Sequence, residues 1–108
     1  MNNCIILYPS KTFKVLSLEH EKLSEILGEI TFVGAISEEN VFAIGSLNVS
    51  TDSPLNEFCS SDEYFEKDVR GTVVLIGSDN NGNSCDICVE NVLLLLKNSL
   101  LSVNQKGV

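Results

Sequence analysis

Hydrophobic and polar positions change period several times along the chain, and the clearest pattern lies at residues 72–76. These residues are apolar or β-branched, and Gly71 and Gly77 close the run at its two ends. Short runs of this kind between turn signals are typical of a strand that is buried on both faces. Residues 79–83 follow with the sequence Asp-Asn-Asn-Gly-Asn, which predicts a turn because Asn and Gly tolerate positive φ. We therefore expect the rest of the chain to pack around this strand.

The N-terminal residues predict a β-hairpin. Residues 4–8 form an apolar run that stops at Pro9, because proline cannot donate a hydrogen bond to a strand ladder. Apolar and polar residues then alternate, so Phe13 and Val15 are expected to face the core and Lys14 the solvent. The second strand of the hairpin should therefore have one wet face.

A helix and a second pair of strands are expected next. Ser17 suits the N-cap of a helix, and the apolar spacing after it predicts an amphipathic helix of about two and a half turns. Gly28 suits the position just after the last helical residue. Residues 30–36 and 41–44 then predict two strands, with a bulge at Gly34 in the first of them.

The C-terminal part predicts a short strand at residues 84–87 and a helix from residue 88 or 89 to residue 100. The apolar positions of this helix cover more than half of its surface, which indicates burial or a partner and predicts self-association. Residues 1–101 are expected to form one α+β domain, and residues 102–108 a flexible tail. The expected fold is a mostly antiparallel sheet of about five or six strands with two helices, the C-terminal one packed on one face.

The charge balance restricts the class of partner. The formal net charge is −8, from 15 acidic and 7 basic residues. This sign argues against direct binding to duplex nucleic acid, whose phosphates need Lys and Arg. It is compatible with a basic protein partner, and equally with an acidic surface that only keeps a small protein soluble.

The apolar content and the cysteines bear on location. Hydrophobic residues make up 44% of the chain, which argues against disorder. The N-terminal residues show no signal-peptide pattern, and no run approaches the roughly 20 apolar residues of a membrane helix. We therefore expect a cytoplasmic protein without membrane contact, in which the four cysteines stay reduced.

Residues 48–68 form a long segment with little periodicity. Between Asp52 and Asp68 there are six acids and one base, and residues 61–67 allow a short helix. A loop of this length in a small domain is either functional or mobile. Interfaces favour aromatic residues within a polar rim, so the loop is a candidate partner-binding site; the alternative is a solvated loop whose aromatics pin it to the core. The candidate residues are Phe58, Asp62, Glu63, Tyr64, Phe65, Glu66 and Asp68.

Cys85 and Cys88 form the sharpest local motif. Their spacing suits half of a zinc site or a redox pair, but the sequence lacks a second such pair and the context of a thioredoxin-like site. Ile87 is expected to point inward, so the preferred interpretation is a pair of buried structural thiols. His20, the one histidine, is interpreted as a surface residue, and residues 79–83 lack the acids of a calcium loop. No catalytic residue, metal or cofactor is predicted.

Several motifs occur in a fixed order along the chain. A short helix ends at a glycine, a Pro-Leu-Asn step occupies residues 54–56, residues 68–72 lead into the apolar strand, and the last helix begins with an acidic residue. Over roughly residues 3–97, this order resembles a family of short proteins of unknown function from phages, plasmids and bacteria. Gly28-Glu29 stands where that family usually has a Gly-Gly pair. The family has no agreed activity, so the resemblance implies an origin in a mobile element.

The favoured function is binding without catalysis. We expect a small phage-type accessory protein of the host cytoplasm that acts as a counter-defence inhibitor of a host protein with a basic surface. The alternative is a sponge that sequesters a small cyclic or ADP-ribose-type nucleotide immune signal, for which Lys11, Lys14 and Arg70 would have to converge on phosphate. A homo-oligomer through the C-terminal helix is also expected. An enzyme is not expected, because no set of acid, base and nucleophile is visible.

Overall fold

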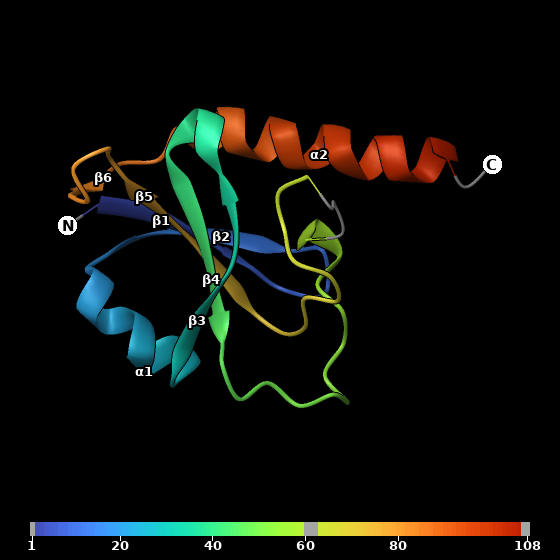
Figure 1. Cartoon of the computed structure of the whole chain (residues 1–108), viewed down its shortest axis with the longest axis horizontal. Coiled ribbons are helices and arrows are strands. Elements are labelled where there is room, and N and C mark those ends of the chain that lie inside the picture. Colours follow the sequence, from blue (N-terminus) through green and yellow to red (C-terminus); the bar gives the residue numbers. More distant parts are fainter. Residues whose placement is uncertain (1, 60–62, 107–108) are drawn as a thin grey trace.

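The computed structural model describes residues 2–59 and 63–106, and it shows a six-stranded antiparallel sheet with two α-helices (Figure 1). The strand order is β2-β1-β5-β4-β3, and β6 pairs with the C-terminal end of β5. The α+β fold expected from the sequence is confirmed. The strands are β1 Asn2–Leu7, β2 Phe13–Leu18, β3 Ile30–Ile36, β4 Val41–Ser46, β5 Val73–Ser78 and β6 Ser84–Cys85. The helices are α1 Leu23–Leu27 and α2 Val89–Lys106, with 3₁₀ turns η1 His20–Lys22, η2 Ser37–Glu39 and η3 Glu57–Cys59.

Strand β5 lies at the centre of the sheet, as predicted, between β1 and β4. Successive side chains of a strand point to opposite faces, so β5 contributes to two hydrophobic clusters. One cluster contains Val73 and Leu75 with Val92 and Leu96 of α2, and the other contains Val74 and Ile76 with Leu23 and Leu27 of α1. The two helices therefore cover opposite faces of the sheet, called here the α1 face and the α2 face (Figure 1).

The hairpin around Pro9 is confirmed, but the expected orientation of its second strand is wrong. Phe13 and Val15 are 47% and 42% exposed, whereas Leu16 packs against the cluster on the α1 face. Lys14 pairs with Ile6 and so shares the α1 face with Leu16. The physical reason is that β2 is an edge strand, and only the cluster on the α1 face reaches it among the described residues. Alternation fixes the two faces of a strand, but it does not say which face is covered.

The first helix is shorter than expected. Strand β2 continues to Leu18, so Ser17 lies in a strand and is not an N-cap. The chain then makes the turn η1 and the five-residue helix α1. Gly28 ends this helix as predicted, with a φ of 73° and its N–H donating to the carbonyl of Ser24 at 2.9 Å. A helix this short covers only part of the α1 face.

Strand β3 contains the predicted bulge. The pairing register with β4 shifts between Phe32 and Gly34, which leaves Val33 as the extra residue. A Cβ atom at Gly34 would collide with the carbonyl oxygen of Tyr64. Glycine is therefore required here because another segment of backbone lies directly against the strand.

Helix α2 packs on one face of the sheet, as expected, and is longer than predicted. It extends to Lys106, into the segment 102–108 that the sequence predicts to be a tail. Val92 and Leu96 are buried and Leu94 is exposed, so the core uses only part of the broad apolar stripe. Self-association through this helix stays a prediction. In the described part of the chain, no helix has the length and apolar character needed to cross a membrane.

Candidate acidic interface

One buried side chain, Asn56, ties the long loop between β4 and β5 to the sheet. Its amide nitrogen donates to the carbonyls of Leu7 and Gly71, at 2.9 and 2.8 Å, and its amide oxygen accepts from the N–H of Phe58 at 3.1 Å. Asn56 is 2% exposed. A buried amide with all these partners fixes the loop to the sheet, because leaving any of them unpaired would cost free energy. This role of Asn56 was not predicted from the sequence.

Backbone and side-chain bonds close the loop at its base. The N–H of Asn56 donates to the carbonyl of Val69 at 2.8 Å, and the N–H of Gly71 donates to the carbonyl of Pro54 at 3.0 Å. The guanidinium of Arg70 donates to the carbonyl of Ser53 at 2.9 Å. The two ends of the loop therefore run side by side, and these bonds close the base of the loop.

The middle of the loop docks on the outer edge of β3. The N–H of Ala35 donates to the carbonyl of Tyr64 at 2.9 Å, and the N–H of Glu66 donates to the carbonyl of Val33 at 2.8 Å. The short helix expected at residues 61–67 is absent from residues 63–67, because their peptide groups bond to β3 instead. Residues 61 and 62 lie outside the described part of the chain.

The aromatic residues of the loop point inward. Tyr64 and Phe65 are buried, and Phe58 is half-buried against the cluster on the α2 face. These rings pin the loop to the core, which is the alternative weighed from the sequence. They are not exposed anchors for a partner.

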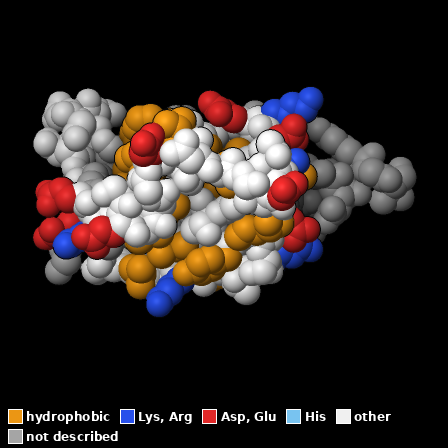
Figure 2. All heavy atoms as spheres, turned by 90° about the horizontal axis from the view of Figure 1, so that it is seen from below, with side chains coloured by type: hydrophobic (Ala, Val, Ile, Leu, Met, Phe, Trp, Pro, Cys, Tyr) orange, Lys and Arg blue, Asp and Glu red, His pale blue; other side chains and the backbone are white. Residues whose placement is uncertain are grey.

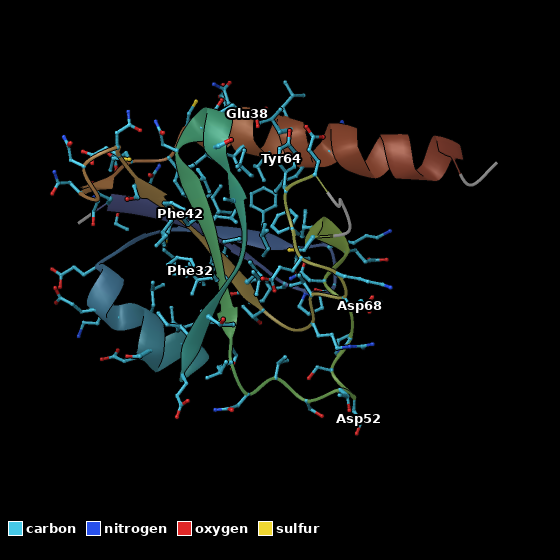
Figure 3. All side chains as sticks on the ribbon, in the orientation of Figure 1. Phe32, Glu38, Phe42, Asp52, Tyr64 and Asp68 are labelled. Atoms are coloured by element: carbon cyan, nitrogen blue, oxygen red, sulfur yellow. The ribbon has the colours of Figure 1, made fainter. Side chains whose placement is uncertain are left out.

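The acids of the loop remain at the surface. Glu63, Glu66 and Asp68 are exposed, whereas Asp62 lies outside the described residues. Figure 3 shows Asp52 at the far tip of the loop, away from Asp68, so the acids of the loop do not form one tight cluster.

A further acid joins this surface from the β3–β4 turn. The hydroxyl of Tyr64 donates to Oε2 of Glu38 at 3.4 Å, and both residues lie beside that turn in Figure 3. Burial raises the pKa of Tyr64, and the carboxylates of Glu38 and Glu63 raise it further, so the phenol stays protonated and able to donate. We call the surface formed by Glu38, Glu63, Glu66 and Asp68 the acidic rim.

Two aromatic residues that the sequence analysis did not single out lie exposed on the α1 face. Phe32 of β3 and Phe42 of β4 are 64% and 38% exposed. Their rings meet edge to face, with centroids 5.7 Å apart and planes at 67°. Ile30 of β3 and Ile26 of α1 are exposed as well. Figure 2, viewed from below the orientation of Figure 1, shows hydrophobic groups at the surface with acidic side chains around them.

Strand β3 links the aromatic pair, Phe32 and Phe42, to one residue of the acidic rim. Val33 accepts the backbone hydrogen bond from Glu66 and is adjacent to Phe32 in β3. The pair is exposed because α1 is too short to cover this end of the sheet. The sequence does not predict this exposure, because it follows from the short length of α1, which leaves part of the α1 face uncovered.

The three cations of the nucleotide alternative have separate surroundings. Lys11 forms an exposed ion pair with Glu57 at 3.7 Å, and Arg70 is bound to the loop base. Lys14 is exposed on the α1 face of β2. A shallow groove lies beside the β1–β2 turn, but among the described residues its lining carries no positive charge: it consists of Tyr8, Pro9, Ser10, Thr12 and Pro54. The nucleotide sponge stays a prediction without a geometric observation behind it.

The expected pair of buried thiols is not present at Cys85 and Cys88. Cys85 is half-buried and Cys88 is exposed, although Ile87 is buried as predicted. The side chain of Asn3 bonds to both backbone groups of Ile87, at 2.9 and 2.6 Å, and this holds Ile87 inward. The residue after it consequently faces solvent.

The buried thiols belong instead to Cys4 and Cys59. Burial raises the pKa of both thiols, that of Cys59 to about 12. The side chain of His20 lies outside what the structure describes. Within the described residues, no three His, Cys, Asp or Glu side chains are grouped as a metal site requires.

No family model, no curated protein and no solved structure matches this chain. The resemblance to short phage, plasmid and bacterial proteins therefore stays a prediction.

Proposed function

We propose that the protein is a non-enzymatic binding protein that recognises a partner protein with a basic surface. The observation that carries this proposal is the exposed edge-to-face pair of Phe32 and Phe42, on the sheet whose edge strand β3 also binds the acidic loop. Protein interfaces combine an apolar, aromatic centre with a polar surround, and exposed apolar patches with a polar rim mark such sites.

The two parts have different roles. The rings of Phe32 and Phe42 supply apolar area that binding removes from water, which gives the complex its lifetime. The acidic rim supplies a negative potential that attracts a basic partner and speeds encounter, more strongly at low salt. Compared with the sequence-based hypothesis, the anchoring role moves from the loop aromatics to the aromatic pair, and the acidic residues keep their role.

The family resemblance supplies the setting for the proposal. In a phage or plasmid context, the partner is a host defence or nucleic-acid-processing protein in the host cytoplasm, and binding inhibits it. The acidic surface then competes with the phosphates that such a partner normally binds.

Capture from host lysate, read by mass spectrometry, tests the proposal with two sets of variants. Phe32→Ala with Phe42→Ala should weaken capture of the main partner by at least about tenfold, since each ring buries considerable area. The control is Leu94→Ala, an exposed apolar residue on α2 that should leave capture unchanged.

A charge test is independent of the rings. Neutralising Glu63, Glu66 and Asp68 should slow association and flatten its dependence on salt. Its matched control neutralises three exposed acids elsewhere, Glu21, Glu25 and Glu90. Capture that withstands both the ring and the rim changes would refute the proposal. Calorimetry with cyclic and ADP-ribose-type nucleotides on the unaltered protein separates it from the sponge alternative, because only the sponge binds them.

A further inference from the structure

Strand β2 lies at one edge of the sheet. Within the described part of the chain it pairs only with β1. In that hairpin the N–H of Tyr8 donates to the carbonyl of Thr12 at 2.9 Å. Hydrogen-bonded and non-bonded pairs alternate along antiparallel strands, so Lys14 and Leu16 turn their peptide groups toward β1. The residues whose peptide groups point outward are Phe13, Val15 and Ser17.

The same edge carries exposed apolar side chains. Phe13 and Val15 lie on the α2 face, about half exposed, beyond the cluster that α2 covers. At the other end of the sheet, residues 64–66 occupy part of the outer edge of β3. An uncovered strand with outward peptide groups and apolar side chains is a template for pairing with another strand.

We propose that a second copy of this chain pairs with β2, antiparallel and related by a two-fold axis at Val15. This is the one symmetric register that pairs all three outward residues. It places Val15 opposite Val15 and Phe13 opposite Ser17 of the second copy. Each hydrogen-bonded pair exchanges two bonds, so the three pairs supply about six.

Charge favours this register over a shift toward the β1–β2 turn. Lys11 and Glu19 flank β2 at its two ends, and both are exposed. In the proposed pairing, the turn that carries Lys11 of each copy lies at the same end as Glu19 of the other, which brings opposite charges together at both ends. A shift by one pairing step would instead place Lys14 directly opposite Lys14, and like charges facing each other destabilise a strand pair.

The resulting dimer has a continuous sheet. Since β2 and β3 lie at opposite ends of the sheet, the two aromatic pairs and acidic rims remain accessible at its far ends. The dimer would therefore bind a repeated partner surface with two sites at once. The pairing itself does not depend on the proposed function.

Sedimentation velocity over a range of concentrations tests the dimer. The wild-type chain should show a monomer–dimer equilibrium. Val15→Pro should raise the dissociation constant by about tenfold or more, because proline cannot donate the hydrogen bonds that the two Val15 residues exchange at the two-fold axis. The N–H of Val15 has no bond to β1, so this change should leave the fold intact by circular dichroism. Val15→Thr keeps the N–H and should still dimerise.

A charge-reversal cycle provides a second test that spares the strand backbone. Lys11→Glu and Glu19→Lys should each weaken the dimer, and the double variant should restore it. Glu57→Gln is the control, because it removes the charge that pairs with Lys11 inside one copy, leaves Lys11 available to Glu19 of the other, and so should not weaken the dimer.

Cross-linking reports the register. In a Cys88→Ser background, oxidised Val15→Cys should form a disulfide-linked dimer and Lys14→Cys should not. Cross-linking by Lys14→Cys alone would overturn the register. A wild-type chain that stays monomeric up to millimolar concentration, or a dimer indifferent to Val15→Pro and to the charge cycle, would overturn the proposal.

Discussion

Replacement of Asn56 by alanine should destabilise the fold more than any surface change in the same loop. The variant removes the donors to the carbonyls of Leu7 and Gly71 and the acceptor for the N–H of Phe58. Each buried hydrogen bond contributes about 1 kcal/mol net, so three of them give a loss of about 3 kcal/mol. For a domain of this size, that corresponds to a fall in Tm of roughly 12 °C.

Urea denaturation followed by circular dichroism measures this loss. The control is Asn48→Ala, because Asn48 is exposed in the same loop. The slope of the free energy against urea should be unchanged, so the effect should appear as a shift of the midpoint. A loss below about 1 kcal/mol would refute the reasoning, because it would mean that the three partners find other bonds.

The variant Asn56→Asp adds a sign test. A carboxylate at this site cannot donate to the carbonyls of Leu7 and Gly71, so the folded state should favour the protonated form and raise the carboxyl pKa above its usual value of about 3.9. Below about pH 3.9 the carboxyl is protonated in both the folded and the unfolded state, so ionisation does not lower the stability of the variant. The loss of stability relative to wild type should grow as the pH rises from there through the raised folded-state pKa. A variant whose relative stability instead improved between acid and neutral pH would contradict this.

Three further outcomes are expected. Gly34→Ala should push the segment at Tyr64 off β3, which would speed hydrogen exchange of the peptide groups that join them, while the β1–β2 hairpin stays protected. The exposed thiol of Cys88 should react rapidly with an alkylating reagent at neutral pH, whereas Cys59 should react only on unfolding, because burial raises its thiol pKa to about 12 and leaves little thiolate. Glu38→Gln should lower the pKa of Tyr64 toward its ordinary value, followed by NMR of the ring; an unchanged titration would show that Glu38 does not contribute to the shift.

Local patterns predicted the parts of the fold that depend on local chemistry. The apolar run closed by two glycines identified the central strand, and Gly34 identified the bulge, because both depend on residues next to one another in the chain. The end of α1 at Gly28 followed for the same reason.

The errors concern which face of an element meets another element. Phe13 and Val15 face solvent because the covering helix lies elsewhere, and Tyr64 and Phe65 face the core because their backbone pairs with β3. Neither orientation can be predicted from the alternation of apolar and polar residues within a single segment. Asn56 could not be recognised as buried from composition, since asparagine is usually a surface or turn residue and its partners are distant in the chain.

The central position of β5 has a consequence for the order in which the sheet assembles during synthesis. Synthesis delivers the residues of two hairpins, β1–β2 and β3–β4, before those of β5, and in the finished sheet these hairpins have no direct pairing with each other. Strand β5 joins them by pairing with β1 and β4. The hydrogen bond from Asn3 of β1 to Ile87 forms later still, because the two residues are 84 positions apart. Such long-range closure slows folding. A nascent chain that stalls before residue 73 should therefore lack the joined sheet, which can form only when synthesis is nearly complete.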